Sequence, residues 1–85
     1  MYRIELRRKA ASALDKLPKR DFTAIIEAVK NLADLPRPKG VEKIKSAGLW
    51  RIRYGDYRIV YSIDDDNKTV IILRIGHRRE IYRSL

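Results

Sequence analysis

Residues 49–63 read LWRIRYGDYRIVYSI, and this stretch decides the fold. On both sides of Gly55-Asp56, apolar or aromatic side chains occupy every second position. A period of two is typical of a strand with one buried face. A two-residue loop with glycine first is typical of a type II′ hairpin turn. The pattern therefore predicts two antiparallel strands, over 49–54 and 57–63, joined by that turn.

Further strand patterns lie on both sides of this hairpin. A short strand is predicted over 42–45, and alternation over 2–6 predicts a first strand near the N-terminus. An acidic turn at 64–67 precedes a strand over 69–75, which is rich in β-branched residues and which we expect Gly76 to end.

Between the first strand and the rest, apolar residues recur at helical spacing and predict helices over about 8–16 and 18–35. Pro36-Arg37-Pro38 ends the second helix. The expected fold is α+β, in the order β-α-α-β-β-β-β. It has an antiparallel twisted sheet with two N-terminal helices packed on one face, in a single domain over residues 1–85.

The charge of the chain is strongly basic. Lys and Arg number 20 against 11 Asp and Glu, which gives a net charge of +9. Residues 1–42 hold 10 basic and 6 acidic side chains, and residues 43–85 hold 10 and 5, so the excess is not a basic tail. A folded body of this charge attracts polyanions such as nucleic acids, although a merely solvated surface would also carry it.

Several classes of protein are disfavoured by what the sequence lacks. Without cysteine there is no disulfide framework or thiolate metal site, and no apolar run approaches the roughly 18 residues of a membrane span. The N-terminus lacks the apolar stretch of a secretory signal, so we expect a cytoplasmic protein with no membrane contact. No glycine-rich phosphate loop, nucleophile elbow or paired ligand motif occurs, and we expect neither metal nor cofactor.

Alternation along three strands predicts a basic side of the sheet. In the strands over 49–54 and 57–63, we expect the helices to cover Trp50, Ile52 and Tyr54 and then the odd-numbered positions 57–63. In the strand over 69–75, we expect them to cover Ile71, Leu73 and Ile75, which leaves Val70 and Ile72 on the open side. The arginines expected on the open side are Arg51, Arg53, Arg58, Arg74 and Arg78. Neighbouring strands lie about 4.8 Å apart, so these guanidinium groups can converge on one phosphate. Alternatively, these arginines could protect the sheet edges from aggregation. A purely structural arrangement would intersperse acidic residues among them, however, and these strand interiors hold no Asp or Glu.

Two further residues near the C-terminus are candidates for chemistry. His77 is the single histidine, it adjoins Arg78, and imidazole is the side chain that ordinarily titrates nearest neutral pH. It could accept a proton beside the basic side, or it could be a structural residue. Tyr82 could stack on a base, or it could pin the C-terminus to the sheet.

The motifs KIK at 43–45, the hairpin segment 49–61 and IGHRREIY at 75–82 carry a family resemblance. Together with the helix end at 32–38, they resemble the RelE toxins of bacterial and archaeal toxin–antitoxin pairs, over essentially the whole chain. The resemblance implies a metal-independent endoribonuclease that enters the ribosomal A site. Such an enzyme cuts mRNA there by attack of a 2′-hydroxyl on the adjacent phosphate.

By position, the resemblance implies catalytic roles for Arg51, Arg53, Arg58, Arg78 and Tyr82, the last by stacking on a base. Some members carry lysines in place of Arg51 and Arg53. Arginine stays protonated, so here it would stabilise the phosphorane electrostatically, and we hypothesise that His77 transfers a proton. The residues expected to bind RNA are Lys43, Lys45, Arg74 and Arg79.

The resemblance also implies partners. These are the ribosome with its mRNA, a cognate RelB-like antitoxin, and operator DNA only through the antitoxin complex. ParE relatives share the fold but poison DNA gyrase, and Arg58, Arg78 and Tyr82 argue against that alternative. A third interpretation is a nucleic-acid-binding module that acts only within a DNA-bound repressor complex.

Overall fold

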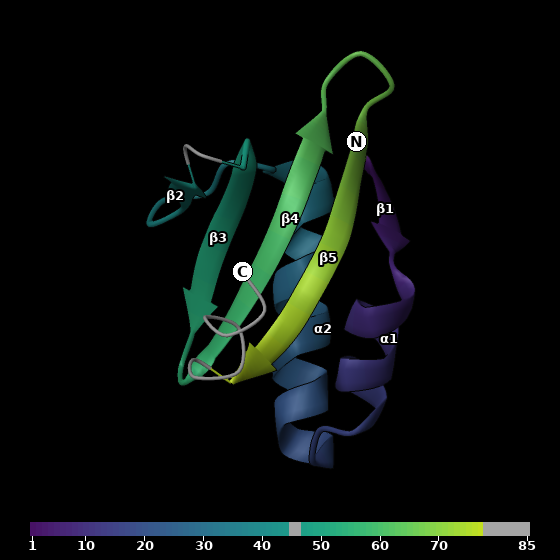
Figure 1. Ribbon diagram of the computed structural model, residues 1–85, viewed down its shortest axis with the longest axis vertical. Coiled ribbons are helices and arrows are strands. Elements are labelled where there is room, and N and C mark those ends of the chain that lie inside the picture. The colour runs from purple at the N-terminus through teal and green to yellow at the C-terminus, as the bar shows by residue number, and fades with distance from the viewer. Residues whose placement is uncertain (45–46, 78–85) are drawn as a thin grey trace.

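The computed structural model describes residues 1–44 and 47–77. The elements along the chain are β1 (Arg3–Leu6), α1 (Arg8–Asp15), α2 (Lys19–Asp34), β2 (Glu42–Ile44), β3 (Leu49–Tyr54), β4 (Tyr57–Asp64) and β5 (Thr69–His77). Figure 1 shows both helices on the same side of one twisted sheet. The predicted order of elements and the α+β class are confirmed.

The sheet has the strand order β1-β5-β4-β3-β2. Strands β2 to β5 form the predicted antiparallel run. Strand β1, however, joins β5 in parallel, so the sheet is mixed where a wholly antiparallel one was expected. The two helices carry the chain from one edge of the sheet to the other, and such a crossover does not impose the antiparallel direction that a tight hairpin imposes.

Both predicted turns are present. Tyr54 pairs with Tyr57, and Gly55 has a φ of +58° while Asp56 stays outside the left-handed region, as a type II′ turn requires. In the acidic turn, the Asp64 carboxylate accepts hydrogen bonds from the Asn67 side-chain amide at 2.8 Å and from its backbone N–H at 3.1 Å. These bonds lower the pKa of Asp64.

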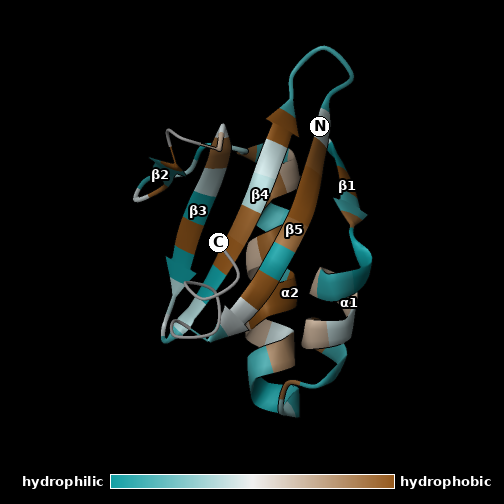
Figure 2. Ribbon diagram, viewed as in Figure 1, coloured by the Kyte–Doolittle hydropathy of each residue, from teal (hydrophilic) through white to brown (hydrophobic). Residues whose placement is uncertain are grey.

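The core lies between the helices and the sheet. Its buried members are Ala10, Leu14, Ile25, Val29, Leu32, Ile59, Tyr61, Val70, Ile72 and Ile75. Figure 2 shows long hydrophobic stretches along β4 and β5, the neighbouring strands that provide half of these side chains, and the helices provide the other half. The Tyr61 hydroxyl donates to the Pro36 carbonyl at 2.7 Å, and burial raises the pKa of Tyr61 to about 12.

A β-bulge interrupts the pairing of β4 with β5. Val60 lies opposite Arg74 and Tyr61 lies opposite Ile72, so Leu73 is an extra residue on β5. An extra residue shifts the alternation of the strand by one position. Even-numbered residues of β5 therefore face the helices before the bulge, and odd-numbered residues face them after it.

This bulge corrects the predicted faces of β5. Val70 and Ile72 lie in the core, and the expectation that Ile71 and Leu73 face the helices instead is wrong. Ile75 faces the helices as predicted, because it lies beyond the bulge and pairs with the buried Ile59. Residues 70–73 are all apolar, so their pattern contains no signal of which side is buried.

Replacing Ile72 by alanine should lower the free energy of unfolding by about 2–5 kcal/mol, because it opens a cavity in the core. Ile71→Ala is the matched control, since Ile71 lies opposite Ser62 on the side away from the core and is only partly buried. Urea unfolding followed by circular dichroism measures both variants. Equal losses would contradict the bulge.

Candidate nucleic-acid interface

Four arginines of the described residues lie on the sheet side opposite the helices. Arg53 and Arg58 are directly opposite each other on β3 and β4. Arg51 and Arg74 flank Val60, because both are paired with it. We call these four arginines the arginine face. Directly opposite residues have Cβ atoms about 4.5–5.5 Å apart, so the long side chains of Arg53 and Arg58 can reach a single phosphate.

Arg58 is the most buried member of the arginine face, with only 7% of its surface exposed, where an exposed side chain was expected. Its hydrogen bond is a long one, from Nη1 to the Tyr57 carbonyl at 3.4 Å. Within residues 1–44 and 47–77, no carboxylate forms an ion pair with it. On β5 it lies opposite Gly76, which has no side chain. A buried cation without a counterion is costly, so this position favours an anionic ligand.

Arg74 and Arg51 have different surroundings on this face. Arg74 donates from Nη1 to the Leu73 carbonyl at 2.9 Å, and its Nε is buried without a hydrogen-bond partner in the described part of the chain. Arg51 donates from Nη2 to Glu42 Oε2 at 3.0 Å and forms an ion pair with it. The arginine face therefore has an acidic neighbour on β2, which the sequence analysis missed. The register of β2 on β3, which pairs Glu42 with Arg51, would have revealed it.

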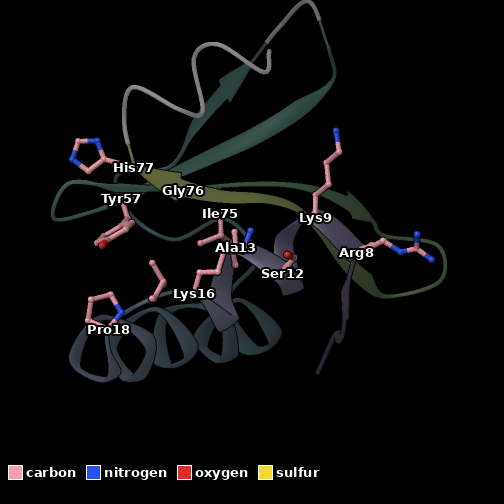
Figure 3. A pocket seen from close by; sticks show the side chains of 11 residues that line it. Arg8, Lys9, Ser12, Ala13, Lys16, Pro18, Tyr57, Ile75, Gly76 and His77 are labelled. Carbon is pink, nitrogen blue, oxygen red and sulfur yellow. The ribbon is translucent and has the colours of Figure 1, made fainter.

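His77 does not lie beside the arginine face, and that expectation is wrong. Its Cα is paired with Tyr57, and its ring makes an edge-to-face contact with the Tyr57 ring at 6.1 Å between centroids. Both residues border a cleft next to α1, where the Tyr57 ring points towards the helices and the exposed His77 ring stands at the end of β5 (Figure 3). The reason is alternation, since His77 is two residues beyond Ile75, which faces the helices. The strand also continues through Gly76, which was expected to end it.

Lys43 lies away from the arginine face, and its predicted role in RNA binding stays a prediction. It is paired with Trp50, and its Nζ lies 5.5 Å from the centroid of the Trp50 ring. The Arg37 guanidinium lies 5.0 Å from the same ring. These are cation–π contacts with an aromatic side chain that packs against the core. The other predicted residues, Lys45, Arg78, Arg79 and Tyr82, lie outside the described residues.

Comparison with known proteins gives the family. Residues 4–82 match the family described as the ParE toxin of the type II toxin–antitoxin system parDE. The chain belongs to this family. Toxin RelG of Mycobacterium tuberculosis is 39% identical to it over 84 residues, which cover 96% of this chain and 97% of RelG. The chain is accordingly a type II toxin of the RelE group.

Solved structures of relatives share the fold of this toxin. A chain of the toxin–antitoxin complex RelBE2 from M. tuberculosis has a TM-score of 0.80 at 35% identity, over 91% of this chain and 98% of that one. A chain of the archaeal RelE–RelB complex from Pyrococcus horikoshii has a TM-score of 0.81 at 32% identity, over 91% and 94%. These likenesses confirm the expected family and its fold.

The described part of the toxin contains neither a cluster of metal ligands nor a membrane-spanning helix. No group of three or more His, Asp or Glu side chains there is arranged to hold a metal ion. No helix there is long and apolar enough to cross a membrane.

An ionic network ties the N-terminus of the toxin to the turn after β4. The Asp65 carboxylate accepts hydrogen bonds from Arg37 Nη2 at 2.9 Å and from the Tyr2 hydroxyl at 2.6 Å. The Arg37 bond, followed by the Tyr2 bond, lowers the pKa of Asp65. The same carboxylate raises the pKa of Tyr2 and of Arg37. Arg37 is thereby held over Trp50, on the helix side of the sheet.

Replacing Arg58 by leucine should raise the free energy of unfolding by about 1–4 kcal/mol, the range for exchanging buried charges for apolar side chains. Arg53→Leu removes the same charge from an exposed position and should change the stability by less than about 0.5 kcal/mol. Urea midpoints measure both. A destabilised Arg58→Leu variant would show that Arg58 supports the fold instead of serving a ligand.

The Asp65 network should make stability depend on acid pH. Because its folded pKa lies below the ordinary value of 3.8, its contribution is complete above pH 3.8 and is lost as the pH falls through the folded value. The difference in unfolding free energy between wild type and Asp65→Asn should therefore shrink as the pH is lowered from neutral. Urea titrations of both proteins across that range test this, and a constant difference would refute it.

Proposed function

We propose that this toxin is a ribosome-dependent endoribonuclease that cleaves mRNA in the ribosomal A site without a metal ion. The observation that carries the proposal is Arg58, a buried guanidinium without an ion pair among the described residues, directly opposite Arg53. A fold gains nothing from that arrangement, whereas a phosphodiester would neutralise it. The likeness to toxins named RelG and RelE adds support.

The proposed reaction is a transesterification within the RNA. The 2′-oxygen of one nucleotide attacks the adjacent phosphorus, and the bond from phosphorus to the 5′-oxygen of the next nucleotide breaks. The products are a 2′,3′-cyclic phosphate and a 5′-hydroxyl, and the proton lost by the 2′-hydroxyl is balanced by one gained by the leaving oxygen. The phosphorane between them carries more negative charge than the substrate, so fixed cations accelerate its formation.

In this proposal the arginine face stabilises the phosphorane. Arg58 and Arg53 bind the non-bridging oxygens, and Arg51 and Arg74 hold the strand on either side. Arginine does not give up its proton at physiological pH, so none of these four is the base. Glu42 competes for Arg51 until the RNA arrives.

The residues beyond β5 complete the proposed site. Following the family resemblance, Arg78 contributes another guanidinium and Tyr82 stacks on a base of the mRNA. Lys45, which follows β2 in the sequence, and Arg79 are proposed to bind the RNA backbone. All four lie outside the described residues, so their roles rest on the resemblance.

The proposed protein partner is a RelB-like antitoxin. Two of the similar structures, from M. tuberculosis and P. horikoshii, are complexes with such a partner. A toxin with a net charge of +9 suits an antitoxin segment rich in acidic residues. Contact with operator DNA would then run through the antitoxin complex.

A second candidate function is binding to DNA gyrase, because the matching family is described as a ParE toxin. A toxin that acts by blocking a protein has no need for a buried guanidinium that lacks an ion pair within residues 1–44 and 47–77. Since relatives with one fold can differ in function, an experiment must separate the two.

The deciding experiment adds the purified toxin to a cell-free translation reaction and maps the 5′ ends of the mRNA. Cuts within A-site codons, ending in 5′-hydroxyl groups, are expected. Arg58→Ala should slow cleavage about 10²–10³-fold, corresponding to about 2.7–4 kcal/mol for one lost transition-state contact. His77→Ala, on the other side of the sheet, should cleave at nearly the wild-type rate.

Intact mRNA together with gyrase-dependent DNA breaks would contradict the nuclease proposal and support binding to DNA gyrase. If Arg58→Ala cleaves mRNA as fast as the wild type, the toxin is a nuclease but the arginine face is not its catalytic site. A large loss in His77→Ala would return His77 to the mechanism.

A further inference from the structure

The helix side of the sheet has a cleft of its own, between α1 and the end of β5 (Figure 3). Its volume is about 630 Å³. That lies within the roughly 300–1,000 Å³ typical of ligand sites. Ile75, Ala13 and Leu17 form part of its apolar lining. The cleft is separated from the arginine face by the thickness of the sheet, because Ile75, which lines it, faces the helices.

The polar groups of this cleft are almost all cationic or hydroxyl donors. Arg8, Ser12 and Lys16 follow one another at a spacing of one helical turn along α1, and Lys9 lies beside them. His77 stands at the opposite end from Arg8 and Lys9 (Figure 3). No Asp or Glu is among the described residues that line the cleft.

These cations lack neutralising partners. In the described part of the chain, Arg8, Lys9 and Lys16 form no ion pair. Asp21, the carboxylate that reaches the cleft wall, accepts a hydrogen bond from the Tyr57 hydroxyl at 3.0 Å. The positive charge of the cleft is therefore available to a ligand.

The stability of α1 does not explain why cations occupy its first turn. Arg8 and Lys9 lie in its first turn, where the positive end of the helix dipole disfavours cations, and that turn has no acidic residue. The preceding Arg7 makes no side-chain cap. A helix selected for stability alone would carry Asp or Glu there, so binding is the better explanation.

We infer that this cleft binds the phosphates of an RNA strand, as a second anion site on the opposite side of the sheet from the arginine face. Lys and Arg side chains together with a serine hydroxyl are the usual donors to nucleic-acid phosphates. A row of such donors at regular spacing suits the repeated charge of a strand better than a single ion. The inference concerns binding alone and holds whether or not the toxin is a nuclease.

The test is titration of the whole toxin with a short single-stranded 2′-O-methyl RNA, which the proposed nuclease could not cleave. His77 is the single histidine and borders the cleft, so its ring proton signal is assigned without ambiguity. This signal should shift saturably as RNA is added. It should also shift in Arg58→Ala, which alters the arginine face only.

The double variant Lys9→Glu, Lys16→Glu should abolish that shift and lower the slope of log affinity against log salt by about two. The control Lys30→Glu, Lys39→Glu changes the net charge equally at exposed positions that do not line the cleft, and it should keep both the shift and the slope. Circular dichroism checks that all variants are folded.

An unmoved His77 signal at saturating RNA, or an unchanged salt slope in the Lys9, Lys16 variant, would overturn the inference. Poly-glutamate is the second probe. If it shifts the His77 signal at lower concentration than the RNA does, the cleft is a site for an acidic protein segment and the RNA assignment fails. A failure of mRNA cleavage on ribosomes would leave these outcomes unaffected.

Discussion

Burial of one side of β3, β4 and β5 against the helices determines on which side of the sheet the charged residues of these strands lie. A small domain with one core can hide one side of its sheet, and successive side chains of a strand point to opposite sides. Arg51 and Arg53 are on the open side because Trp50 and Ile52 are packed against the core. The same rule puts Arg58 there, because Tyr57 and Ile59 are inside. The arginine face is thus on the side of the sheet opposite the core.

The sequence predicts well which side chains face the core and which face the open side where polar and apolar residues alternate. The hairpin over 49–63 alternates clearly, and its strands, its turn and the placement of its arginines are confirmed. The prediction failed in β5, where four consecutive apolar residues hide a bulge. It failed again at His77, which was expected beside the basic side of the sheet but lies next to Tyr57 at the cleft beside α1. Alternation applied two positions beyond Ile75 would have put His77 on the helix side.

Other features of the site depend on information that a single strand does not contain. The ion pair of Glu42 with Arg51 follows from the register between two strands, and the burial of Arg58 follows from what surrounds β4. The parallel direction of β1 depends on how two helices cross the sheet. Pairing between distant segments is a tertiary property, so local pattern predicts the elements better than their partners.

The charge distribution also implies that the proposed RNA and the proposed antitoxin compete for the same cations. The chain has a net charge of +9, and both the arginine face and the cleft beside α1 hold cations without carboxylate partners in the described residues. Repulsion among these groups is relieved by any polyanion that covers them. The proposed RNA and the proposed acidic antitoxin satisfy the same demand, so each must exclude the other wherever their footprints overlap. Inhibition of such a toxin then needs no conformational change, because occupation of the cations by carboxylates suffices. If Arg53, Arg58 and Arg74 also had acidic neighbours, as Arg51 has in Glu42, the arginine face would bind neither partner well.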